Sequence, residues 1–595
     1  MRSAVIAHED GQLETAYPLY RKFVADNPQQ PTALQLFGLL LSQLGQYEPA
    51  IALMRESLHL FPDQPEVANN LGNALSKIGL FDEAIESYSE AVRMLPQYVE
   101  AQRNLGLCYA KTDQPDKALQ CYERCVETRP DDQTTWLALG NLRRDGDDLD
   151  GAIEAFEKAL ELKPDFAAAQ HNLGVCLRLR HRPEEALEHY EAARNAGLDR
   201  AELHHNIGNA LIDTQQAGPA IDAYREALAR NPDDPETHRN LNSLLWQQDM
   251  LEDYLKSYRD ALEHKPEAEQ LRLAYATSLN QMDAWEEAER VLREGLQHSG
   301  ETASVKSLLA YTLEGQERWE EALRMHDAAA NTPGSVPNHL ISYGRALLVC
   351  RKPEEALRQV QAGTALTPFN QRALAYLGLC WRLLDDERDA VLNDYDKLVV
   401  PYDLPVPEGY SSAEEFNERL RDVLLPLHIG IRHPADQTLR NGSQTSGDLF
   451  DRSEPEIRAL MASLSLCIED YIGRFPRSDE HPLYMRRSHG YEFSASWSVR
   501  LASCGYHTMH THPLGWISSA YYVEVPHEVS EGNEQGGGIK FGEPDINIGD
   551  AGEARLTIQP SAGKLVLFPS YMWHGTVPFD SDEPRMTTPF DVVPT

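Results

Sequence analysis

Two patterns of apolar positions divide the chain. Up to about residue 390, small and aromatic residues recur at a fixed step of 34 residues, and from Tyr491 onward short β-rich runs are broken by Gly, Pro and Asn. A fixed step of this length predicts a repeated pair of helices, and short runs of β-branched and aromatic residues predict strands. We therefore expect an all-α part first and a β-rich part after it.

Four columns of residues carry the 34-residue step. The glycine column is Gly38, Gly72, Gly106, Gly140, Gly174 and Gly208, resuming at Gly344 and Gly378, and the alanine column is Ala16, Ala50, Ala84, Ala118, Ala152, Ala186, Ala220, Ala288, Ala322, Ala356 and Ala390. The aromatic column is Tyr20, Tyr88, Tyr122, Phe156, Tyr190, Tyr224 and Tyr258, and the proline column is Pro28, Pro62, Pro96, Pro130, Pro164, Pro232, Pro266 and Pro368.

Each column has a physical role in a helix pair. Gly and Ala allow two antiparallel helices to cross closely, the aromatic ring fills the space beside them, and Pro ends the second helix. The period and these positions resemble the tetratricopeptide repeat, which implies about eleven to twelve repeats stacked into a superhelix with a concave groove. The first repeat begins almost at Met1, so the native chain could start earlier.

A fifth column is asparagine, two residues before the glycine position. Asn is a poor helix former inside a helix, so another interaction should favour it. A row of amides in a groove could pair with the backbone of an extended peptide, and it resembles the asparagine ladder of the protein O-GlcNAc transferases. The alternative is that Asn-Leu-Gly is simply a common sequence in such repeats and that the Asn side chains are solvated. The expected peptide-binding residues are Asn70, Asn104, Asn172, Asn206 and Asn240.

The columns end after Ala390, and the proline-rich segment 402–409 cannot continue a helix pair. We therefore expect two domains, 1–396 and 397–595. In the second, helices are expected at 412–427 and 455–475 with a polar loop at 440–447 between them. Strands are expected at 496–501, 516–525, 556–559, 564–568 and 586–590. Helices followed by many short strands suggest a jelly-roll barrel with supporting helices.

Three histidines in this second part have the spacing of a metal site. His510 and His512 lie at i and i+2, so on a strand both would point to the same face, and His574 would join them from a strand far along the chain. Neutral imidazoles suit Fe, Zn, Cu or Ni, and three ligands leave coordination positions open.

The order of motifs from 397 to 595 resembles the double-stranded β-helix Fe(II)/2-oxoglutarate dioxygenases: His-x-His-Pro, then Ser-Ser-Ala-Tyr-Tyr-Val, then Gly-Lys-Leu-Val-Leu-Phe-Pro-Ser before His574. The resemblance implies Fe(II), 2-oxoglutarate and O2, and a jelly-roll fold. It also implies that Arg585, with Thr587, binds the far carboxylate of 2-oxoglutarate, and that Tyr521 or Tyr522 supplies a hydroxyl to it. Otherwise Arg585 would form a surface ion pair with Asp582 or Glu583.

The chain departs from that family at one ligand. Most members have Asp or Glu where this chain has His512, so a three-histidine site is one negative charge short. The alternatives are that only His510 and His574 bind iron with water, or that His507 replaces one of them. Glu524 or Asp545 is a further candidate carboxylate.

Composition narrows the class of partner. The net charge of −38 over 595 residues opposes nucleic-acid binding, and no apolar run is long enough to span a membrane. The eight cysteines form no C-x-x-C pair, so we expect free, mostly buried thiols in the cytoplasm. The resemblance to the Fe(II)/2-oxoglutarate dioxygenases, joined to the repeats, implies a 2-oxoglutarate-dependent hydroxylase of a protein or peptide held by the superhelix. The alternatives are a tetratricopeptide adaptor with a degenerate metal-binding barrel, and an enzyme that acts on a small molecule while its repeats serve self-assembly.

Overall fold

The structure is a computed structural model that describes residues 1–298, 300–428, 438–445, 447–488, 490–531 and 536–595. The chain divides into two compact units, Met1–Asp199 and Arg200–Thr595. Among the described residues, no helix is long and apolar enough to cross a membrane.

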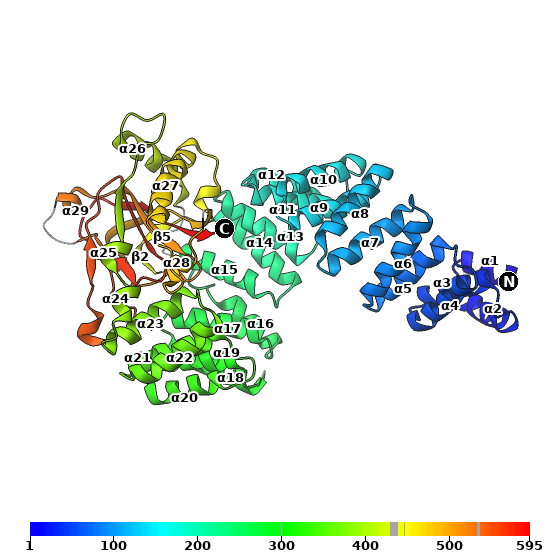
Figure 1. Cartoon of the computed structure of the whole chain (residues 1–595), viewed down its shortest axis with the longest axis horizontal. Coiled ribbons are helices and arrows are strands. Elements are labelled where there is room, and N and C mark those ends of the chain that lie inside the picture. Colours follow the sequence, from blue (N-terminus) through cyan, green and yellow to red (C-terminus); the bar gives the residue numbers. More distant parts are fainter. Residues whose placement is uncertain (299, 429–437, 446, 489, 532–535) are drawn as a thin grey trace. The chain divides into compact units, whose positions relative to one another are not determined.

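The first unit consists of helices that follow one another as antiparallel pairs (Figure 1). Their bounds are α1 Arg2–Glu9, α2 Leu13–Asp26, α3 Pro31–Gln43, α4 Tyr47–Leu60, α5 Pro65–Lys77, α6 Phe81–Met94, α7 Val99–Lys111, α8 Pro115–Thr128, α9 Gln133–Asp145, α10 Leu149–Leu162, α11 Ala167–Leu179 and α12 Pro183–Asn195.

The packing within each pair confirms the predicted roles of the columns. A Cβ atom added to Gly72 would lie 2.6 Å from the ring of Tyr88, and one added to Gly140 would lie 2.5 Å from Phe156. Glycine is therefore required because the aromatic side chain of the second helix occupies the place of a Cβ atom. Pro62 follows two residues after the end of α4, as expected of a helix terminator.

A further column appears in the turn between the two helices of each repeat. Its residues have positive φ, between 52° and 81°, and they are Gly11, Gly45, Gly79, Asp113, Asp147, His181, Gln215, Asp249, Asp283, Glu317, Arg351 and Asp385. This left-handed conformation is natural for glycine and costs free energy for other residues. The turn is thus kept in every repeat although only the first three have glycine.

The second unit begins with the same type of helix pair. Its helices up to the first strand are α13 Ala201–Asp213, α14 Ala217–Arg230, α15 Pro235–Gln247, α16 Lys256–His264, α17 Glu269–Gln281, α18 Trp285–His298, α19 Ala303–Gly315, α20 Trp319–Ala330, α21 Pro337–Val349, α22 Pro353–Leu366, α23 Gln371–Leu383, α24 Arg388–Leu392 and α25 Tyr395–Leu398.

One repeat differs where the columns fail. Asn242 occupies the glycine position and Tyr254 the alanine position, and helix α16 begins only at Lys256 after a left-handed Leu255. The Asn242 side-chain oxygen accepts a hydrogen bond of 2.6 Å from the backbone N–H of Leu255. The Asn242 side chain thus bonds to the backbone just before the second helix, which is shortened to nine residues.

Strands begin directly after α25. The strands are β1 Val400–Asp403, β2 Leu439–Gln444, β3 Tyr491–Ser496, β4 Val499–His507, β5 Ile517–Glu524, β6 Ile539–Phe541, β7 Leu556–Ile558, β8 Lys564–Pro569, β9 His574–Thr576, β10 Arg585–Thr588 and β11 Phe590–Pro594. The accompanying helices are α26 Ala413–Leu424, η1 Leu425–Leu427, η2 Leu449–Asp451, α27 Pro455–Gly473, α28 Pro482–Met485, α29 His527–Glu531 and η3 Gly549–Gly552.

These strands form two antiparallel sheets. The larger has the order β1-β8-β5-β10-β4-β2, with β11 pairing with both β5 and β3, and the smaller has the order β7-β6-β9. One apolar core contains residues of α26, α27, β5 and β8, such as Phe416, Leu464, Tyr522 and Leu567. The expected helices and β-rich part are therefore present, and Ser412 caps α26 by accepting a hydrogen bond from the N–H of Glu415.

Two local expectations were wrong. The polar segment 440–447, expected as a loop, contains most of strand β2, which pairs with β4. The expected strand 496–501 is broken between β3 and β4. In each case the pairing partner, rather than the local sequence, decides the conformation.

A segment between β6 and η3 joins the β-rich part to the last repeats. The Tyr376 hydroxyl of α23 donates to the carboxylate of Asp545, with oxygen distances of 3.0 and 3.2 Å, and Arg345 of α21 lies 3.8 Å from the same carboxylate. Ile546 and Ile548 are buried in an apolar cluster with residues of α21 and α23. Burial raises the pKa of Asp545, while the two arginines Arg345 and Arg372 oppose that rise.

All eight cysteines are free, and all but Cys350 and Cys504 are buried. The expectation of free, mostly buried thiols is confirmed.

Candidate metal centre

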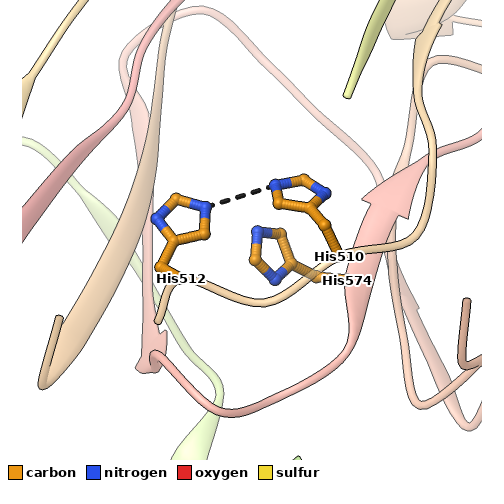
Figure 2. A group of neighbouring side chains, drawn as sticks. All are labelled: His510, His512 and His574. Atoms are coloured by element: carbon orange, nitrogen blue, oxygen red, sulfur yellow. Dashed lines mark hydrogen bonds between the residues drawn. The ribbon is translucent and has the colours of Figure 1, made fainter. Parts of the chain in front are cut away.

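The three histidines come together at one end of the β-rich part. His510 and His574 form an isolated antiparallel bridge through backbone hydrogen bonds of 2.9 and 3.1 Å, and the N–H of His512 donates to the carbonyl of Ser570 at 3.0 Å. His510 and His512 follow the end of β4 rather than lying on a named strand, so the predicted strand placement was wrong. The bridge nevertheless holds both rings beside His574, as Figure 2 shows.

The ring nitrogens converge on one point. One nitrogen of each ring lies within 4.8 Å of a nitrogen of the other two, and the Nε2 atoms of His510 and His512 are 3.2 Å apart. Among the described residues, these three histidines are the side chains whose spacing could hold a metal ion. The sequence predicted these three residues.

Hydrogen bonds at the other side of each ring fix which nitrogen faces the centre. The Nδ1 atoms of His510 and His574 lie 2.8 and 2.9 Å from the carbonyls of Thr508 and Met572. Because a carbonyl can only accept, each Nδ1 carries the proton and each Nε2 keeps a free lone pair. The two rings are therefore oriented as metal ligands before any ion binds.

Burial keeps these rings neutral. It lowers the pKa of His510 to about 3, with the nearby His512 adding to the effect. Burial also lowers the pKa of His574 well below its ordinary value. Neutral imidazole is the form that binds a transition metal, so the donor set fits such an ion.

His512 has a different partner on its outer side. Its Nδ1 lies 2.7 and 2.8 Å from the two carboxylate oxygens of Asp591 in β11. The hydroxyl of Ser518 in β5 donates to the same carboxylate at 2.6 Å, and the Ser518 hydroxyl is 2.8 Å from that of Ser570. Sequence reasoning missed Asp591, because nothing in the sequence relates it to a histidine 79 residues earlier.

The other candidate ligands have other contacts. Glu524 lies 3.6 Å from Arg421, and Asp545 contacts Tyr376 and Arg345, so neither carboxylate joins the histidines. His507 lines the same cavity, with its Nδ1 3.1 Å from the Thr438 hydroxyl, but it is outside the group of three.

Arg585 lies in the same cavity as the three histidines and is only 4% exposed. Its guanidinium donates to the carbonyl of Gly537 and lies over the ring of Tyr522 at 5.1 Å, and its Nε has no hydrogen-bond partner. It forms no ion pair with any residue that the structure describes, so the surface ion pair with Asp582 or Glu583 was wrong. A buried cation without an acidic partner can accept an anion.

The two tyrosines face opposite ways, as expected of neighbours on a strand. The Tyr521 hydroxyl donates to Asn417 of α26 at 2.6 Å, whereas the buried Tyr522 hydroxyl has no partner. Thr587 lines the cavity and is paired with Tyr522 across the sheet. Tyr522 and Thr587, but not Tyr521, are therefore placed with Arg585.

The cavity itself is small, about 50 Å³. That volume is enough for an ion and water, since about 10–15 Å³ of such space holds one water. To bind 2-oxoglutarate, Arg585 would have to release the carbonyl of Gly537 and donate to a carboxylate of the co-substrate instead. The donor groups fit both an ion and a dicarboxylate, while the space shown suits the ion.

The asparagine column forms hydrogen bonds between successive repeats. The amide of Asn104 donates to Asn73 at 3.0 Å, that of Asn172 to Asn141 at 2.7 Å, and that of Asn240 to Asn209 at 3.4 Å. Each acceptor lies 31 residues earlier. This stabilises the stacking and explains why Asn is tolerated inside these helices. The five column residues, Asn70, Asn104, Asn172, Asn206 and Asn240, remain partly exposed.

Comparison with family models gives three matches. Residues 495–591 match the family described as "Putative 2OG-Fe(II) oxygenase", residues 250–350 match the tetratricopeptide repeat, and residues 12–276 match the C-terminal domain of cilia and flagella-associated protein 70. Among curated proteins no sequence matches the chain. The chain thus has tetratricopeptide repeats followed by a segment similar to 2-oxoglutarate and iron oxygenases.

Three solved structures are similar to parts of the chain. A crystal structure of MamA is 26% identical, covers 26% of this chain and 91% of its own, and gives a TM-score of 0.26. A crystal structure of YrrB, a tetratricopeptide protein, is 25% identical, with 31% and 96% covered and a TM-score of 0.28. The C-terminal part of a repeat protein from Cytophaga hutchinsonii is 18% identical, with 40% and 98% covered and a TM-score of 0.33.

Proposed function

We propose that the chain is an Fe(II)/2-oxoglutarate-dependent dioxygenase that hydroxylates a protein or peptide recruited by its repeats. The observation that carries this proposal is the presence of Arg585, buried and without an acidic partner, in the same cavity as three converging imidazole nitrogens. A metal site alone would not need this cation.

The histidines and Arg585 would have different roles. His510, His512 and His574 would hold the iron through Nε2, and Arg585 with the Tyr522 hydroxyl would bind the far carboxylate of 2-oxoglutarate. When bound, iron and 2-oxoglutarate supply the activation of dioxygen and the electrons for hydroxylation, with succinate and CO2 as co-products. The apolar walls, including Trp497 and Ile539, keep bulk water from the centre.

The repeats would supply the substrate. Tetratricopeptide repeats are typical of protein–protein interaction, and a partly exposed row of amides can pair with the backbone of an extended peptide. In the second unit the last repeat contacts the segment that precedes the histidine-bearing strand, through Tyr376 and Asp545. This contact supports a role for the last repeats in presenting a substrate to the β-rich part.

The test is turnover with the full chain. Iron, ascorbate, 2-oxoglutarate and a library of peptides should give succinate release and oxygen consumption, abolished in His510→Ala and Arg585→Ala. Absence of both turnover and 2-oxoglutarate binding would rule out the enzyme. If turnover occurred and was unchanged in an Asn104→Ala/Asn172→Ala variant, a small-molecule substrate would be favoured over a peptide in the groove.

A second candidate is a tetratricopeptide adaptor whose barrel keeps a metal without turnover. The small cavity and the missing carboxylate ligand favour it. An adaptor would retain its protein partners in the His510→Ala and Arg585→Ala variants, and it would not consume oxygen.

A further inference from the structure

The three candidate ligands differ in what lies behind them. His510 and His574 donate their Nδ1 protons to neutral backbone carbonyls, whereas His512 donates to a carboxylate. His512 is also the residue that stands where most similar oxygenases have an acidic ligand. In the part of the chain that the structure describes, the carboxylate hydrogen-bonded to one of the three rings, that of Asp591, thus lies behind the ring that replaces an anion.

We propose that Asp591 is a positioning residue that supplies, through His512, the negative charge that the metal centre otherwise lacks. A carboxylate that accepts the Nδ1 proton fixes the tautomer and makes the opposite nitrogen a stronger donor. The charge therefore reaches the metal through the imidazole ring instead of through a directly bound oxygen. This inference rests on the proposed binding of iron by the three histidines.

The surroundings of Asp591 hold it for this role. Asp591 and His512 are 7% and 8% exposed, so water screens their interaction little. The backbone of Asp591 is paired with Ser518 across the sheet, and the Ser518 hydroxyl donates to the carboxylate. In the described part of the chain Asp591 contacts no Lys or Arg side chain within ion-pair distance, so its charge is not neutralised by another cation.

The test compares metal affinities, which do not depend on turnover. Asp591→Asn keeps a side-chain oxygen that can accept the Nδ1 proton but removes the charge. Loss of such an outer partner typically weakens metal binding by about 10- to 100-fold. We therefore expect the Kd for Co(II) to rise by this factor. The titration uses the full chain without 2-oxoglutarate, and the visible absorption bands of bound Co(II) report the binding.

Ser518→Ala is the matched control, because it removes one hydrogen bond from Asp591 and keeps the charge. Its Kd should lie closer to that of the parent than to that of Asp591→Asn. The double variant His512→Asp/Asp591→Asn moves the charge onto the ligand itself and should regain most of the lost affinity. Thermal unfolding of each apo variant shows whether it is folded.

The outcomes separate this inference from the proposed function. A Kd for Asp591→Asn within twofold of the parent, or no Co(II) binding by the parent, would overturn the role of Asp591. If Asp591→Asn did not fold, failure of the folded double variant to bind Co(II) would overturn it, and binding within about tenfold of the parent would support it. A parent that binds Co(II) in an Asp591-dependent way but never releases succinate would contradict the oxygenase proposal only.

Discussion

The ring of Tyr376 in the last repeat packs against Trp573, the residue directly before the candidate ligand His574, with ring centroids 5.4 Å apart. The same tyrosine donates its hydroxyl to Asp545. One side chain of the repeats thus contacts both the residue next to a candidate metal ligand and the segment between β6 and η3.

Removing this hydroxyl should destabilise the second unit. In Tyr376→Phe the ring still packs on Trp573, but the partly exposed carboxylate of Asp545 loses one hydrogen bond, which typically contributes about 0.5–1.5 kcal/mol. Urea unfolding measures the difference in the free energy of unfolding. Tyr311→Phe, whose side chain is partly exposed beside Arg345, should change it by less than about 0.5 kcal/mol. Equal effects of both substitutions would contradict the role of the Asp545 contact.

The glycine column predicts whether a Gly→Ala substitution lowers the free energy of unfolding. Gly72→Ala would place a Cβ atom 2.6 Å from the Tyr88 ring, and such overpacking typically costs about 1–3 kcal/mol. Gly146→Ala, where the nearest atom is a backbone oxygen at 3.5 Å, should be nearly neutral. Both lie in the first unit, so thermal unfolding of matched variants gives a direct comparison.

The positive-φ turn column can be tested in both directions. Gly79→Ala meets no atom within 4 Å, so its cost of about 1 kcal/mol would come from the left-handed backbone alone. Asp113→Gly, at the same position of the next repeat with φ of 56°, should raise the free energy of unfolding. A stabilising Gly79→Ala would show that the turn does not impose this conformation.

Arg585 should be needed for the co-substrate and not for the metal. A charge-assisted hydrogen bond contributes about 1.5–3 kcal/mol, so Arg585→Gln should weaken 2-oxoglutarate binding by about 10-fold or more. Calorimetric titration of the Co(II)-loaded chain measures this, while the Co(II) affinity stays unchanged. Tyr521→Phe is the control, since its hydroxyl is bonded to Asn417 away from the cavity.

His428 should make stability depend on pH. Burial lowers its pKa to about 4, whereas a histidine in the unfolded chain has its ordinary pKa of 6.5. Between these values the unfolded chain binds more protons, so stability falls as the pH decreases from 6.5 towards 4, by up to about 3 kcal/mol. His428→Gln should reduce this slope in urea unfolding measured at several pH values, and an unchanged slope would exclude His428 as its source.

The sequence predicted the features that recur or that are fixed by local chemistry. The glycine and aromatic columns follow from the close crossing of two helices, the three histidines follow from the chemistry of a metal site, and Arg585 was found through the family resemblance. Pairings between distant segments escaped prediction: Leu439–Gln444 became a strand because β4 lies beside it, and the contact of Asp591 with His512 depends on β11 reaching that position.

The docking of Ile546, Ile548 and Asp545 against α21 and α23 has a consequence for protein engineering. A fragment starting at residue 397 would leave these side chains and Trp573 uncovered, and such a patch promotes aggregation. Chimeras that exchange the preceding repeats for others should therefore place their junction before Pro337, so that the helices from α21 to α24 stay with the β-rich part.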